Sequence, residues 1–138
     1  MITFTGDLYL GANDISIDEK IIDSLSSSNH IISNFENVLF DAQSKLREDK
    51  ESILSFEKSD FEKYISHFEK SIILTLGNNH MHDFGEEGIK FTVDFLNQYK
   101  KISSIGIGNT QNVIEPLVID DDGKKIALLT VSTDEPEV

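Results

Sequence analysis

Three motifs in this sequence carry side chains that could bind a metal ion and move a proton. They are Gly6-Asp7, Asn34-Phe35-Glu36, and Asn78-Asn79-His80 with Asp83 close behind. Each motif comes at or directly after a short apolar run that is typical of a strand. Because α/β sheets bind their ligands at the carboxyl ends of the strands, we expect the three motifs to meet in one site.

The chemistry that these residue types favour is metal-assisted hydrolysis. Two carboxylates would neutralise a divalent cation, an amide oxygen would extend its shell, and the metal would activate water. A neighbouring histidine is a suitable general acid. The chain has no cysteine, so the ligands must be oxygen and nitrogen atoms, which favours Mn, Mg, Fe or Zn. Taken singly, Gly6-Asp7 and Asn34-Phe35-Glu36 are weak motifs, since Asp and Asn at strand ends more often form turns or caps. Asn78-Asn79-His80 is stronger, because it offers a carbonyl ligand and a proton donor together after a buried strand.

The elements that must position these motifs alternate between strand and helix. Residues 59–68 and 85–100 have amphipathic helical patterns, and in the second helix we expect Ile89, Val93 and Leu96 to face the core. Residues 43–55 are highly charged and predict an exposed excursion. This alternation predicts an α/β fold with a mainly parallel sheet flanked by helices. The remaining predicted elements are a helix at 18–25 and strands at 1–6, 30–35, 71–76, 103–107, 113–119 and 125–131.

Length and charge narrow the class of protein. The 138 residues predict a single domain. The net charge of −13 argues against nucleic acid as a partner, because phosphate binding needs a basic surface. We find no signal-peptide pattern and no apolar run long enough to span a membrane. The chain as printed therefore reads as soluble, and its compartment stays open.

Longer stretches around the motifs resemble the CapA-type proteins of bacterial capsule and poly-γ-glutamate synthesis. The resemblance rests on four segments that together extend over nearly the whole chain: GDLYLG at 6–11, NFENVLF at 34–40, LGNNHMHDFGEEGIKFTVDFL at 76–96 and GIGNT at 106–110. That family is similar to calcineurin-like metallophosphoesterases. The resemblance implies that the chain is part of a four-layer αββα sandwich with a metal site at the strand ends.

The resemblance also implies roles for individual residues. Asp7, Glu36 and Asn79 would be metal ligands, His80 would contact phosphate or protonate a leaving group, and Asp83 would orient His80 or its loop. Tyr9 stands where many phosphoesterases carry a metal-binding histidine. The chain has no histidine after residue 82, whereas the family implies further histidines on later strands. We therefore expect 1–138 to be the N-terminal half of a longer domain, with weak or absent metal binding by itself.

Two hypotheses follow for the function. The first is a CapA-like metallohydrolase acting in surface-polymer synthesis, and the second is a non-catalytic scaffold of a polymer-assembly complex that kept the fold without a complete site. An α/β domain with accidental motifs is a third reading. A half-sandwich would expose a sheet face and an unpaired edge, so we expect a homodimer or a partner chain, drawn from surface-polymer biosynthesis components, to cover it.

Overall fold

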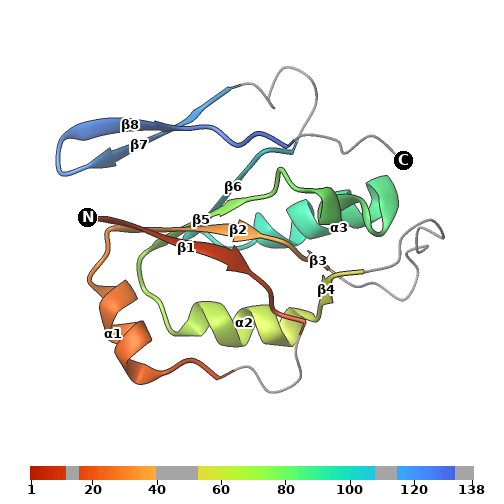
Figure 1. Cartoon of the computed structure of the whole chain (residues 1–138), viewed down its shortest axis with the longest axis horizontal. Helices are drawn as coiled ribbons and strands as arrows, with labels where there is room; N and C mark the ends of the chain where they lie inside the picture. The colour runs from red at the N-terminus through yellow and green to blue at the C-terminus, as the bar shows by residue number, and fades with distance from the viewer. Residues whose placement is uncertain (12–15, 40–52, 108–114, 133–138) are drawn as a thin grey trace.

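A four-stranded parallel sheet forms the centre of the molecule (Figure 1). The computed structural model describes residues 1–11, 16–39, 53–107 and 115–132. The strand order is β1-β2-β5-β6, so the predicted strands at 1–6, 30–35 and 71–76 are neighbours and parallel, as expected. The α/β class is thereby confirmed. The strand bounds are β1 Ile2–Leu8, β2 His30–Phe35, β5 Ser71–Thr75 and β6 Ile102–Ile105.

Three helices cover one face of this sheet. The alternation of side chains along a strand sends Ile31 and Phe35 of β2, with Ile72 and Leu74 of β5, into the same buried cluster as the helices. The Asp18 side chain accepts a hydrogen bond from Lys20 N at 2.8 Å and caps the first helix. The bounds of the helices are α1 Glu19–Ser26, α2 Lys58–Ser66 and α3 Gly85–Leu96.

The second face of the sheet is covered in part by a β-hairpin (Figure 1). Its strands are β7 (Leu117–Asp121) and β8 (Lys124–Leu128), so β7 starts later than the predicted strand at 113–119, whose first two residues lie outside the described ranges. Asp122 and Gly123 both have positive φ, 55° and 81°, which suits a two-residue hairpin turn. Ile119 packs on Ile32 and Ile73 from the sheet.

A short parallel pair, β3 (Val38–Leu39) and β4 (Ser55–Phe56), extends from the carboxyl end of β2. Leu39 N donates to the buried Thr92 Oγ1 of α3 at 2.9 Å, which ties the pair to that helix. The exposed excursion was predicted for residues 43–55. Residues 43–52 lie outside the described ranges, and Ser55 at its end belongs to β4. No helix in the described ranges is long and apolar enough to cross a membrane.

The core face of α3 includes the predicted residues Ile89, Val93 and Leu96 and extends beyond them to Thr92. Thr92, Phe95 and Leu96 are buried, whereas Ile89 and Val93 are only half-buried and pack at the side of the core. Leu96 is buried as predicted, and Ile89 and Val93 contact the core but keep part of their surface exposed, whereas the burial of Thr92 was not predicted. A buried threonine is tolerated here since its hydroxyl bonds both Leu39 N and, at 2.8 Å, Gly88 O.

Candidate functional site

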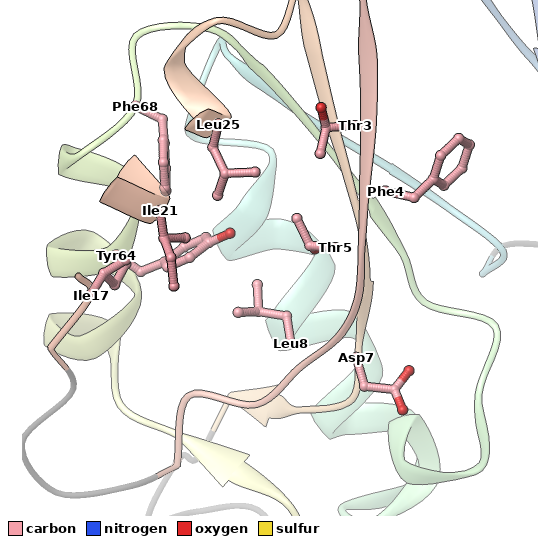
Figure 2. A pocket seen from close by; sticks show the side chains of 10 residues that line it. All are labelled: Thr3, Phe4, Thr5, Asp7, Leu8, Ile17, Ile21, Leu25, Tyr64 and Phe68. Carbon is pink, nitrogen blue, oxygen red and sulfur yellow. The ribbon is translucent and has the colours of Figure 1, made fainter. Parts of the chain in front are cut away.

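A β-bulge in β1 sets the direction of Asp7. The pairing of β1 with β2 shifts register between Phe4 and Asp7, and Gly6 between them has φ 76°. An extra residue in one strand moves the following side chains to the other face. Asp7 therefore leaves the sheet on the same side as Phe4, away from the helices, while Leu8 points into the helix layer (Figure 2).

Asn34 joins the two carboxylates predicted as metal ligands. Its Nδ2 donates to Asp7 Oδ1 at 2.9 Å and to Glu36 Oε1 at 3.0 Å. Asp7 is opposite Asn34 in the register of neighbouring strands, and Glu36 follows directly after β2. Because one nitrogen donates both hydrogen bonds, the carboxylates of the first two motifs lie close together at the carboxyl end of the sheet.

The third motif reaches this group through Asn78. Asn78 Nδ2 donates to Asn34 Oδ1 at 3.3 Å and to Phe35 O at 2.9 Å. The Asn78 Oδ1 accepts from His80 N at 3.1 Å and caps a short 3₁₀ helix, η1 (Asn79–His82). The side-chain amide of Asn78 therefore both holds η1 next to β2 and caps the first turn of η1.

His80 and Asp83 form a hydrogen-bonded pair across one turn of η1. Asp83 Oδ2 lies 3.0 Å from His80 Nδ1 and accepts from Leu54 N at 2.8 Å. The Asp83 side chain is fully buried, and that of His80 is 17% exposed. The buried carboxylate thus holds Nδ1 of the ring and leaves Nε2 as the nitrogen that could meet a substrate.

Asn34 and Asn78 belong to the predicted motifs, but neither is among the individual ligands that the resemblance implied. Asn34 and Asn78 connect the motifs, whereas the predicted ligand Asn79 is exposed at the first residue of η1. Asn34 shares a strand face with Glu36 by simple alternation, so its position was readable from the sequence. Asn78 was not, because only the tertiary contact with Asn34 separates it from its neighbour.

The residue types of the cluster fit part of a metal shell. Asp7 and Glu36 are two hard oxygen ligands of the kind that Mn and Mg prefer, with amide oxygens beside them. Within the described residues, however, no group of three or more His, Cys, Asp or Glu side chains could hold a metal ion. The donor set fits a divalent cation whose remaining ligands come from water, substrate or another polypeptide segment.

Fold and site together define an α/β protein with a carboxylate–amide cluster and a His–Asp pair at the carboxyl ends of parallel strands. The family described as bacterial capsule synthesis protein PGA_cap matches the chain over residues 2–137. The chain belongs to this family, which confirms the resemblance seen in its sequence and gives it a role in bacterial capsule synthesis. A comparison with curated proteins finds no match.

Proposed function

We propose that this chain contributes a metallohydrolase-type site to capsule or surface-polymer synthesis. The observation that carries the proposal is the pair of hydrogen bonds from Asn34 to Asp7 and Glu36, which brings two anionic ligands to one point. Two neighbouring carboxylates repel each other, and a cation relieves that repulsion. A divalent metal held there by Asp7, Glu36 and the nearby asparagine amides would supply an activated water.

The protein's own groups have separate tasks in this proposal. Asp83 keeps His80 Nδ1 engaged, which leaves Nε2 to protonate a leaving oxygen. Asn78 fixes η1 against β2 and thereby sets the distance between the imidazole and the carboxylates. The substrate expected from this arrangement is a phosphate ester or a related anionic linkage of a surface polymer.

The incomplete shell supports a second candidate function. Because the described residues hold no cluster of three strong metal ligands, the chain could serve as a non-catalytic scaffold of the capsule-synthesis machinery. In that case the cluster of Asp7, Asn34 and Glu36 would be a structural hydrogen-bond network without turnover.

Calorimetric titration of the chain with Mn²⁺ separates the two candidates. The metallohydrolase proposal expects weak binding that Asp7→Asn and Glu36→Gln each reduce by about tenfold, the equivalent of ~1.4 kcal/mol. Asp94→Asn is the matched control, since it removes an exposed carboxylate of α3. Hydrolysis of p-nitrophenyl phosphate with Mn²⁺ should fall with His80→Gln. Binding that is insensitive to Asp7 and Glu36, or absent at millimolar Mn²⁺, would favour the scaffold.

A further inference from the structure

Strand β1 is an edge strand with backbone groups directed outward. In the described part of the chain its one neighbouring strand is β2. The Met1 carbonyl accepts from Asn29 N at 2.8 Å, so the backbone groups of Met1 and Thr3 face β2. Since these groups alternate in direction along a strand, those of Ile2 and Phe4 point away from the sheet. Such an edge is a template for a further strand.

An apolar groove of about 390 Å³ runs beside this edge, between β1, α1 and α2 (Figure 2). Ile21 lines the groove and is 53% exposed. This exposed fraction is unusually high for an isoleucine surrounded by other apolar side chains. Thr5 and Leu8 of β1 point into the groove, and Phe4 points away from it. The side chains that line the groove from α1, α2 and the residues flanking them are Ile17, Ile21, Leu25, Tyr64 and Phe68.

The unpaired edge of β1 and the groove beside it fit an extended peptide segment. In a strand added next to β1, alternate side chains would point toward the helices and fill the groove. The side chains between them would lie beside Phe4, which is 69% exposed on the opposite face. The occupant therefore needs apolar side chains in alternation, with main-chain hydrogen bonds to Ile2 and Phe4 supplying affinity.

The acidic residues around the groove favour a basic segment as its ligand. The exposed surface of α1 and its cap carries Asp18, Glu19 and Asp23 against Lys20, and Asp7 lies at the end of β1. The whole chain has a net charge of −13. Lysine or arginine side chains at the ends of the added strand would complement this surface and speed its association.

We propose that the edge of β1 and its groove bind an extended segment of a partner protein with alternating apolar residues and basic flanks. A second copy of the chain is a poorer occupant. Its own β1 would offer Thr3 and Thr5 to the apolar groove, and two chains of charge −13 repel each other. This proposal does not depend on metal binding or hydrolysis.

The test is a titration with a fluorescent synthetic peptide in which valine alternates with threonine between flanking lysine pairs. We expect saturable binding by fluorescence anisotropy, weakened by about tenfold or more in Ile21→Asp, because a carboxylate then enters the apolar groove. Leu129→Asp is the matched control, since Leu129 is 63% exposed and does not line the groove. It should leave binding within about twofold of the original value.

Two readouts identify strand addition. Phe4→Pro removes an outward N–H at an edge where proline is tolerated, so it should weaken binding well beyond Phe4→Ala. In the unsubstituted chain the amides of Ile2 and Phe4 should exchange more slowly when the peptide is bound.

Three results would overturn the proposal: no saturable binding, equal binding of a peptide with glutamate flanks, or no protection of Ile2 and Phe4. Sedimentation showing a dimer at micromolar concentration that Ile21→Asp dissociates would assign the groove to a second copy instead.

Discussion

At the scale of single residues, Asn34 is the centre of the candidate site. A neutral amide can donate to two carboxylates at once through its Nδ2, and its Oδ1 remains to accept from Asn78 and, at 3.4 Å, from Thr75 Oγ1. The arrangement keeps Asp7 and Glu36 close without placing a fixed positive charge between them. A fixed positive charge there would compete with a metal ion.

Asn34→Asp should change metal affinity and stability in opposite directions. A third carboxylate between Asp7 and Glu36 adds repulsion in the metal-free chain, so the melting temperature without metal should fall. Mn²⁺ affinity should rise by about tenfold, or ~1.4 kcal/mol. Calorimetry and thermal melts measure the two effects. Asn97→Asp, the same substitution at the exposed end of α3, serves as the control, and an unchanged Mn²⁺ affinity in Asn34→Asp would place the metal elsewhere.

Tyr99 provides a pH-dependent contribution to stability. Burial, together with the hydrogen bond of 2.9 Å to Glu62 and the charge of that carboxylate, raises the pKa of Tyr99 from 10.0 to about 12. Because the folded pKa is the higher one, the protonated phenol stabilises the fold fully below pH 10.0, and the contribution is lost as the pH rises through about 12. Glu62→Gln should move the pKa of Tyr99 toward its ordinary value, as measured by ¹³C NMR of the ring, and a pKa unaffected by this change would rule out Glu62 as a cause.

At the scale of elements, the bulge in β1 couples backbone conformation to the site. Gly6→Ala should destabilise the chain by ~1–2 kcal/mol, because an alanine pays a steric cost at φ 76°. Apart from Gly6 and its two chain neighbours, no described residue has an atom within 4 Å of the added Cβ, so the effect is conformational rather than a clash. Denaturant unfolding measures it. Gly6→Asn should cost less, since asparagine tolerates this conformation better; equal costs for both substitutions would argue against the conformational explanation.

The aromatic cluster under the sheet carries much of the stability. Phe61 is fully buried and its ring lies 5.8 Å from that of Phe35 and 5.5 Å from that of Phe95. Phe61→Ala should cost ~3–5 kcal/mol in unfolding free energy. Val93→Ala, on the half-buried side of α3, should cost only ~1 kcal/mol. Similar losses in urea unfolding for both variants would mean that α3 buries the Val93 side after all.

The strands and helices were largely predictable from the sequence, whereas the burial of Thr92 in α3 was not. The buried run at 71–76 and the cap at Asp18 predicted β5 and α1 because local patterns determine them. The core position of Thr92 depends on a hydrogen bond from Leu39, far away in sequence, and no helical pattern contains that information. The convergence of Asp7 and Glu36 followed from strand order, whereas the hydrogen bond from Asn78 to Asn34 needed the tertiary structure.

At the scale of the whole molecule, the two faces of the sheet are covered unequally. Three helices pack on one face, and the hairpin covers part of the other through Ile119. Asn29 Nδ2 donates to Asp121 Oδ1 at 2.6 Å, and His30 Nε2 lies 3.1 Å from Asp120 O. The hairpin is therefore attached near the amino end of β2, at the opposite end of the sheet from Asp7 and Asn34.

Ile119→Asp should release the hairpin without unfolding the helix layer. A carboxylate cannot replace the contact with Ile32 and Ile73 without a large desolvation cost. Amides of β7 and β8 should exchange faster, binding of an apolar dye should rise, and amides of β5 should stay protected. Val118→Asp is the control, because Val118 is 56% exposed on the same strand. Cooperative loss of protection throughout the sheet would show that the hairpin is part of the main folding unit.

The unequal covering has a consequence for how a large ligand approaches. Asp7 and Asn34 leave the sheet on the face opposite the helices, so the helix layer blocks one direction of entry. The turn of the hairpin lies over the far end of the same face, and the chain after β8 returns to the strand ends, where Thr130 lies close to Gly77 and Gly106. Under the proposed function, a polymer substrate would therefore reach Asp7 and Asn34 from the face opposite the helices, with the segment around Thr130 bordering its path.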